Sequence, residues 1–407
     1  MPPTSFSDPG RRDAWVLALC QGLYTAAISI DLTLTGLTGY QLAPDKALAT
    51  LPFALITVSG AVVTLSASFL LQRLGRRLGF ALGALAGACG GAVSVWAVLR
   101  ADFWLFCLGT AAVGVFQAFA MYYRLAAADA VGPAEKGRAV SRVLAGGVVA
   151  AVLGPLLAAW SKDLFPTALF AGAYLMVCLL GLLSLALLLG LYRDHQTATA
   201  ADPQAHEPPR PFAEVARQPI FAASVANNVI GSAVMMLVMT AAPLAAVGHH
   251  HSIDDGAGII QWHMIGMYAP SLVAGLLIQR VGLGPMLFAG MALNAVCVAV
   301  AMADTGLTAF YLALFCLGVG WNFMFVGGTT LLAQSYRPAE RAKIQGIAEL
   351  VRFVVTAAAS LVAGPLLERY GWAGLNAAVL PLLALAAVMT LWWVAAQRRE
   401  AAVLEQA

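Results

Sequence analysis

The chain has 407 residues, of which 61% are hydrophobic and only 11% are charged, and its formal net charge is +3. Soluble domains carry roughly 25% charged and about 45–50% apolar residues, so a folded protein of this composition cannot hide its apolar surface from water. The small net charge argues against nucleic acid as a partner. The composition therefore predicts a protein that is largely solvated by a lipid bilayer.

Twelve apolar runs follow one another along the chain, each long enough to cross a hydrocarbon core of about 30 Å as a helix. They cover residues 14–40, 46–71, 78–99, 102–127, 140–160, 167–192, 219–247, 257–279, 284–303, 306–333, 344–367 and 372–396. The first run is too long for a signal peptide and lacks an A-x-A site, so we expect no cleaved leader. The sequence predicts an all-α membrane protein with twelve transmembrane helices.

One long polar connection, residues 193–218, separates the sixth run from the seventh. It is rich in Pro and Ala and cannot bury a core, which is typical of a flexible linker. We interpret residues 1–192 as an N-terminal six-helix bundle and residues 219–407 as a C-terminal one.

The Lys and Arg residues predict the orientation, because cytoplasmic loops carry an excess of positive charge. If the N-terminus lies inside, the outer loops retain only Lys46, Arg100, Lys162 and Arg369. The bias predicts that both termini are cytoplasmic.

The two bundles repeat each other in sequence, with three pairs of matching segments at a nearly constant spacing. The pairs are QRLG and QRVG at 72–75 and 279–282, PAEK and PAER at 133–136 and 338–341, and GPLL at 154–157 and 364–367. Such parallel repeats are related by an axis along the membrane normal. In the third run, Gly79, Gly83, Gly87 and Gly91 recur every fourth residue, which favours close helix packing.

The segment LQRLGRR at residues 71–77 resembles the loop signature of the major facilitator superfamily, with Gln72 where the Asp is usual. The resemblance extends over nearly the whole chain. It implies two six-helix bundles around a central cavity that work by alternating access. No phosphate-binding, dinucleotide-binding or hydrolase motif occurs, so we expect a secondary transporter without a cofactor and not an enzyme.

Four side chains at the start of the second bundle are candidate metal ligands. Met235 and Met239 lie four residues apart in the seventh run, as His263 and Met267 do in the eighth. Residues four apart share a helix face, and consecutive antiparallel runs would place both pairs at a similar depth. Thioether and imidazole ligands suit Cu(I) and not Mg²⁺ or Ca²⁺. The alternative is that these side chains fill space or line a cavity.

This M-x-x-x-M and H-x-x-x-M pair is similar to the signature of the CcoA-like bacterial copper importers, a branch of the same superfamily. The resemblance implies that Met235, Met239, His263 and Met267 bind copper, as Cu(I), and that the chain imports it for cytochrome oxidase assembly. The branch is also similar to riboflavin transporters, so import of riboflavin or another small aromatic molecule is the alternative. A membrane sensor or a membrane enzyme is a third hypothesis. A sensor should carry an added soluble domain and an enzyme a catalytic cluster, and the sequence shows neither. We expect a monomer whose partners are the copper ion and the bilayer.

The connection between the seventh and eighth runs is rich in groups that bind cations. His249, His250, His251, Asp254 and Asp255 lie within seven residues of one another. They are candidates for a mouth that collects a metal ion above the Met and His residues. The alternative is an ordinary polar loop, whose geometry nothing in the sequence fixes.

Charged residues within the spans are candidates for proton coupling or gating, because such groups are costly in a bilayer. Asp31 is a candidate proton carrier, or else is hydrogen-bonded to a nearby Ser, Thr or Gln. Glu349 and Arg352 are three residues apart and can neutralise each other on one helix face. For Arg124 we expect a pair with Asp129.

Overall fold

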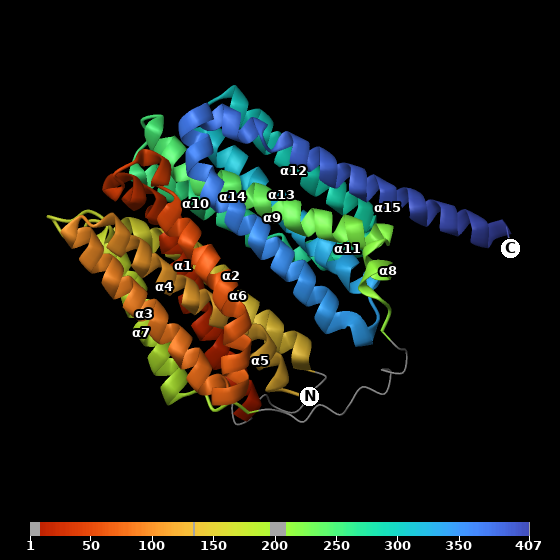
Figure 1. Ribbon diagram of the computed structural model, residues 1–407, viewed down its shortest axis with the longest axis horizontal. Helices are drawn as coiled ribbons and strands as arrows, with labels where there is room; N and C mark the ends of the chain where they lie inside the picture. The colour runs from red at the N-terminus through yellow and green to blue at the C-terminus, as the bar shows by residue number, and fades with distance from the viewer. Residues whose placement is uncertain (1–8, 133–134, 196–208, 407) are drawn as a thin grey trace. The chain divides into compact units, whose positions relative to one another are not determined.

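The computed structural model describes residues 9–132, 135–195 and 209–406, almost all of which are helical. The first half contains α1 (Pro9–Leu42), η1 (Lys46–Leu48), α2 (Leu51–Leu74), α3 (Arg76–Arg100), α4 (Phe103–Ala120), α5 (Tyr123–Asp129), α6 (Lys136–Ser161) and α7 (Ala171–Gly190). The second half contains α8 (Phe212–Ala216), α9 (Pro219–Gly248), α10 (Ile253–Tyr268), α11 (Ser271–Val281), α12 (Leu283–Ala303), α13 (Leu307–Ser335), η3 (Pro338–Glu340), α14 (Arg341–Ala377) and α15 (Leu380–Gln406) (Figure 1).

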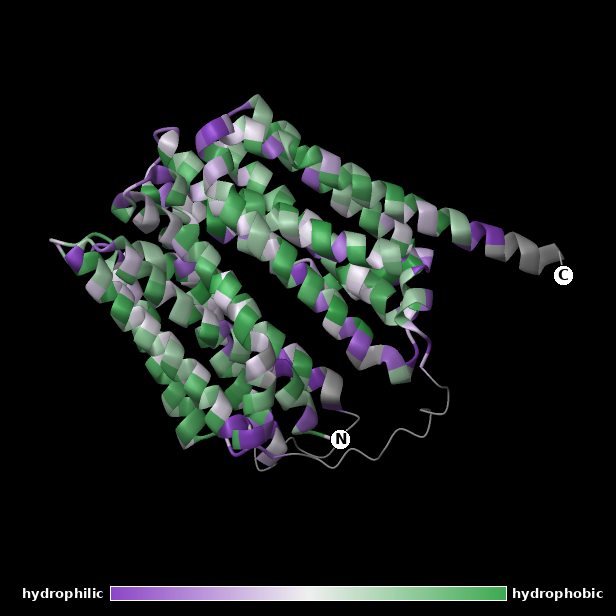
Figure 2. Ribbon diagram, viewed as in Figure 1, coloured by the Kyte–Doolittle hydropathy of each residue, from purple (hydrophilic) through white to green (hydrophobic). Residues whose placement is uncertain are grey.

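The described helices account for twelve membrane spans. Ten helical stretches are long and apolar enough to cross a bilayer, and the bent pair α10 and α11 makes an eleventh. One of the ten covers 57 residues, 343–399, and a straight helix of that length would measure about 85 Å against a hydrocarbon core of about 30 Å. This stretch contains both α14 and α15, so it supplies two spans. The predicted twelve-helix architecture is confirmed, and Figure 2 shows the expected hydrophobic helices with hydrophilic residues at many of their ends.

Two predicted spans are broken rather than continuous. The fourth run divides into α4 and α5 at Met121 and Tyr122, and the eighth divides into α10 and α11 at Ala269 and Pro270. The second break bends the chain by 53°. Proline has no N–H to donate and crowds the preceding turn, so it ends or kinks a helix.

Contacts divide the chain into two compact units, one with residues 1–200 and 252–261 and the other with residues 201–251 and 262–407. Helix α10 is therefore shared, because its first part clusters with the first unit and its last part with the second. The linker proposed over residues 193–218 stays a prediction, since residues 196–208 lie outside the described part of the chain.

Glycines allow the helices of the first unit to approach closely. A Cβ at Gly83 would lie 2.6 Å from Phe119, and one at Gly87 would lie 2.5 Å from Phe116. These contacts join α3 to α4, while Gly91 meets the backbone of Cys178 on α7. The predicted role of the glycine stripe in close packing is confirmed.

Arg76, which follows the turn between α2 and α3, connects this turn to two other segments of the first unit. Arg76 pairs with Asp129 on α5 at 2.6 Å, and its backbone N–H donates to Asp194 at 3.3 Å. The predicted pair between Arg124 and Asp129 is wrong, because Asp129 pairs with Arg76 and Arg124 is exposed. Arg124 and Asp129 are close in sequence and lie on the same helix, but the fold places Arg76 within reach of Asp129 instead.

An ion pair recurs at the matching position of each repeat. Arg11 at the start of α1 donates from Nε to Glu135 at 2.9 Å, and Arg210 donates from Nε to Glu340 at 3.0 Å. Both glutamates come from the PAEK and PAER segments, so the repeat seen in the sequence is present as a repeated contact.

Candidate functional site

Helix α9 is the most enclosed span of the second unit and carries two of the predicted ligands. In its most apolar window 83% of the residues are buried, and it lies against α13, α14 and α15 (Figure 1). Met235 is 7% exposed and Met239 is 3% exposed. Their thioethers thus face protein rather than lipid.

The other two predicted ligands, on α10, are packed against α13. His263 is fully buried, and its Nδ1 lies 2.8 Å from the carbonyl oxygen of Leu314. A Cβ added to Gly318 would lie 2.4 Å from the His263 carbonyl oxygen and 2.9 Å from the Met267 backbone nitrogen. A glycine at this position therefore lets the backbones of α10 and α13 come into close contact beside His263.

The break after α10 is supported by Asn322 of α13. The Nδ2 of this buried amide donates to the carbonyl oxygen of Met267 at 2.7 Å and lies 2.5 Å from the hydroxyl of Ser271. Carbonyls freed at a helix break inside a membrane need such partners. The sequence singled out Met267 as a ligand, whereas the structure shows its carbonyl as part of the joint between α10, α11 and α13.

A second group of side chains lies in the same unit, on α13 and α14. The rings of Trp321 and Phe325 are stacked, with centroids 4.9 Å apart and planes 14° apart. The Arg352 guanidinium lies 5.6 Å from the Phe325 centroid and 4.6 Å from that of Phe353. Trp321 also lies 3.4 Å from the hydroxyl of Ser232 on α9 through its indole nitrogen.

The predicted neutralisation of Arg352 by Glu349 is present in this group. The Nε and Nη2 atoms of Arg352 donate to one oxygen of Glu349 at 3.1 and 2.6 Å. The pair leaves no net charge next to the aromatic rings. We missed Phe325 and Phe353 in the sequence, although Trp321 and Phe325 are four residues apart and so share a helix face.

The loop after α9 uses several of its polar groups for local structure. The ring of His251 approaches the carbonyl oxygen of Thr305 at 2.8 Å through Nε2, and His249 and His251 both lie near Phe310. His250 takes a left-handed conformation with φ of 67°. Within the described ranges no group of three or more His, Cys, Asp or Glu side chains is arranged to hold a metal.

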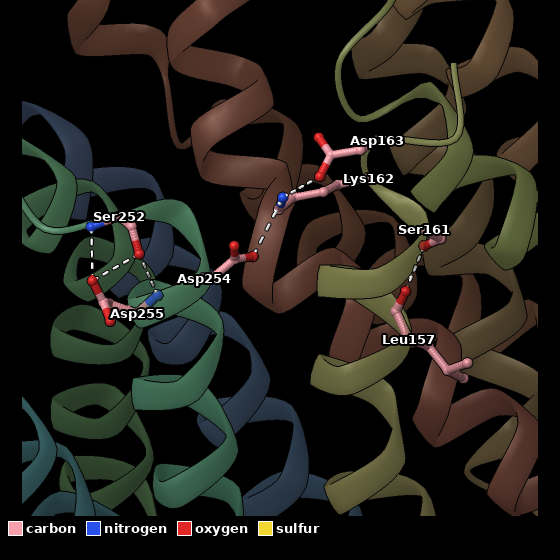
Figure 3. A network of polar contacts seen from close by, with 7 residues as sticks. All are labelled: Leu157, Ser161, Lys162, Asp163, Ser252, Asp254 and Asp255. Carbon is pink, nitrogen blue, oxygen red and sulfur yellow. Dashed lines mark hydrogen bonds and ion pairs between the residues drawn. The ribbon is translucent and has the colours of Figure 1, made fainter. Parts of the chain in front are cut away.

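The two aspartates that follow have separate partners, as Figure 3 shows. Asp255 caps α10 by accepting from the backbone N–H and hydroxyl of Ser252 at 2.9 and 2.7 Å. Asp254 lies 3.3 Å from the Lys162 ammonium, which also contacts Asp163. Gln261 also donates to the carbonyl of Val152 at 3.2 Å, so the first part of α10 is attached to α6.

Asp31 lies in the first unit and is fully buried on α1. One carboxyl oxygen accepts from the Thr35 hydroxyl at 3.2 Å, and Tyr174 of α7 donates to Thr38 at 2.9 Å and approaches Thr35 at 3.3 Å. The other oxygen, Oδ2, has no hydrogen-bond partner among the described residues. The structure therefore places a carboxyl group with one unused oxygen beside a short chain of hydroxyl groups.

Comparison with known proteins gives consistent matches over most of the chain. The family model described as Major Facilitator Superfamily matches residues 14–270 and 233–407. The chain is 41% identical to the riboflavin transporter RfnT of Brucella anthropi over 93% of this chain and 94% of that protein. It is 27% identical to YdeG of Bacillus subtilis, an uncharacterized MFS-type transporter, over 87% of this chain and 85% of that protein.

Two solved structures resemble the fold. A D-xylose-proton symporter has a TM-score of 0.69 at 16% identity and covers 96% of this chain and 97% of its own. The nucleoside transporter NupG has a TM-score of 0.67 at 14% identity and covers 93% of this chain and 99% of its own. At these identities the likeness concerns the fold alone.

The prediction that the substrate is copper is wrong. A relative that is 41% identical over 93% of the chain carries the name of a riboflavin transporter, which favours the alternative that the sequence left open. The physical reason for the error is that helical spacing places Met and His side chains on one face whether they bind an ion or line a packed interior. The spacing alone could not separate these two roles.

Proposed function

The chain belongs to the Major Facilitator Superfamily, and we propose that it imports riboflavin or a closely related flat heteroaromatic molecule by alternating access. The observation that carries the proposal is the 41% identity to a riboflavin transporter over 93% of the chain. It acts as a carrier and not as an enzyme, with both termini in the cytoplasm of a bacterial inner membrane, and it works as a monomer.

The side chains of the second unit support a planar, weakly polar substrate. Stacked or edge-on rings are favourable partners for a flat aromatic molecule, and Trp321 and Phe325 present such a pair on α13. Thioethers also make favourable contacts with aromatic rings, which gives Met235 and Met239 a role as lining for the ring system. The neutral Glu349 and Arg352 pair adds polar groups without a net charge that would repel an uncharged molecule.

Uptake is driven by an ion gradient, and we propose Asp31 as the group that carries a proton. Its burial and its unused Oδ2 are the features that support this role. A carboxyl group that is alternately protonated and ionised can couple proton entry to the change of access. Arg124 is exposed, and we assign it no part in the cycle.

Uptake of radiolabelled riboflavin into a bacterial strain that lacks its own flavin importer tests the proposal. Cells that express the chain should accumulate label above the empty-vector strain, and excess unlabelled riboflavin should compete. Copper accumulation, measured in the same strains, should be unchanged by expression. Membrane-inserted protein without flavin uptake above the vector level would overturn the proposal.

A further inference from the structure

The hydrogen bond of His263 fixes which of its ring nitrogens carries the proton. Its Nδ1 lies 2.8 Å from the Leu314 carbonyl oxygen, and a carbonyl can only accept. Nδ1 must therefore be the N–H donor. In the neutral imidazole the other nitrogen, Nε2, is then an acceptor with a free lone pair.

This acceptor has no donor in the part of the chain that the structure describes. His263 is 0% exposed, and its Nε2 is a buried atom without a hydrogen-bond partner. A buried polar atom that is left unpaired costs about 1–3 kcal/mol. Such an atom in a native structure calls for an explanation, and a role in binding is one.

A second acceptor of the same kind lies on the same seam between α10 and α13. Both hydrogens of the Asn322 amide are directed to Met267 and Ser271, so its Oδ1 is an acceptor, and it too lacks a partner among the described residues. Leu314, Gly318 and Asn322 are four residues apart in turn and thus share one face of α13. Among the described residues, the seam between α10 and α13 therefore offers two acceptors without matching donors.

We propose that His263 recognises the substrate by accepting a hydrogen bond at Nε2 from an N–H group on the edge of a heteroaromatic ring. This inference rests on the proposed function, and it makes His263 the residue that selects ring systems with an imide or amide N–H. Met264 and Met267 next to His263 are apolar and only 3% and 8% exposed, so a ring edge reaches Nε2 when α10 moves away from α13. A polyol tail would bring several hydroxyl groups that these side chains cannot pair.

The test combines a change in the protein with a change in the substrate. His263→Asn can still donate to Leu314 from its amide nitrogen, at the position of Nδ1, but it has nothing at the position of Nε2. His263→Gln can place an amide oxygen near the position of Nε2. The paired substrates are riboflavin and 3-methylriboflavin, in which a methyl group replaces the one imide hydrogen.

For the unmodified protein we expect riboflavin to have a KM roughly 10-fold lower than 3-methylriboflavin, the order expected when one buried hydrogen-bonding group is left unpaired. In His263→Asn the two KM values should converge, and in His263→Gln part of the preference should return. An unchanged thermal unfolding temperature in detergent would show that the helix joint is intact.

The outcomes separate this inference from the function on which it rests. If riboflavin is taken up and the preference for it is equal in the unmodified protein and in His263→Asn, the role of His263 is refuted and the transport function stands. Equal uptake of both flavins by the unmodified protein would also refute the role of His263 and leave the transport function standing. If neither flavin is taken up above the vector level, the proposed function falls, and this inference falls with it.

Discussion

Arg210 donates to Glu340 from three atoms, its backbone N at 2.6 Å, its Nε at 3.0 Å and its Nη2 at 2.9 Å. Arg210 also reaches the carbonyl oxygen of Ser335 at 3.2 Å, and the backbone N–H of Arg337 donates to Glu340 at 2.9 Å. The segment that leads into α9 is thereby fixed to the turn between α13 and α14. The pair of Arg11 and Glu135 makes the equivalent connection in the first unit.

Glu340→Gln is expected to destabilise the protein. The hydrogen bonds from Arg210 lower the pKa of Glu340 from its usual 4.5 to about 2, and loss of a hydrogen bond to a charged group costs about 1.5–3 kcal/mol. A carboxyl group with a lowered pKa stabilises the fold fully above its usual pKa, and this contribution disappears as the pH falls from 4.5 toward 2. Thermal unfolding in detergent at pH 7 and at pH 3 measures both effects.

The exposed Glu368 provides a matched control for this prediction. Glu368→Gln removes the same charge from α14 and should leave Tm unchanged at pH 7. The difference between Glu340→Gln and the unmodified protein should become smaller at pH 3. Equal Tm values for the two variants at pH 7 would contradict the assignment.

Lys162 should tolerate the loss of either neighbouring carboxylate but not of both. Its side chain is 11% exposed, and it contacts Asp163 and Asp254, whose side chains are 60% and 63% exposed. Asp254→Asn or Asp163→Asn alone should cost less than about 1 kcal/mol, as is usual for exposed ion pairs. The double variant leaves a nearly buried ammonium without a counterion, which is more costly. Tm values of the two single variants and the double variant measure the effect, and strictly additive losses would refute it.

Gly318→Ala is expected to separate α10 from α13. The new Cβ would lie 2.4 Å from the carbonyl oxygen of His263, closer than atoms can approach, so the helices must move apart at a cost of about 1–3 kcal/mol. Gly346→Ala on α14 is the control, because nothing lies within 4 Å of its Cβ. It should be neutral or stabilise by about 0.5–1 kcal/mol, since alanine is the better helix former. Thermal unfolding of both variants decides, and a Gly318→Ala protein as stable as Gly346→Ala would contradict the packing.

Asp31→Asn should abolish accumulation driven by a proton gradient. A gradient of one pH unit corresponds to 1.36 kcal/mol and supports about tenfold accumulation per proton. In Asp31→Asn the ratio of internal to external substrate should fall to about one, while exchange of labelled for unlabelled substrate continues. Flux measurements in proteoliposomes with an imposed gradient provide the readout. Thr35→Val, which removes the hydroxyl but keeps the carboxyl group, should still accumulate substrate, and retained accumulation by Asp31→Asn would exclude Asp31 as the carrier.

The fold could be predicted from the sequence to a large extent, because the thickness of the bilayer sets the minimum length of each apolar run. The runs at 219–247 and 284–303 correspond closely to α9 and α12. The division of the eighth run at Ala269 and Pro270 was not anticipated, although proline was its visible signal. The carbonyl of Met267 at this break accepts a hydrogen bond from Asn322, a partner far away in sequence.

The candidate site was harder to predict because its chemistry depends on neighbours. The sequence by itself determined twelve spans, an internal repeat and the buried positions of Met235, Met239, His263 and Met267, since hydrophobic length and helical periodicity are local properties. Only the tertiary structure decided that His263 turns Nδ1 to the Leu314 carbonyl and leaves Nε2 without a partner among the described residues. Hydrogen-bond partners come from other helices, and the identity of the atom that faces a given ring nitrogen is set by helix packing and not by spacing along one chain.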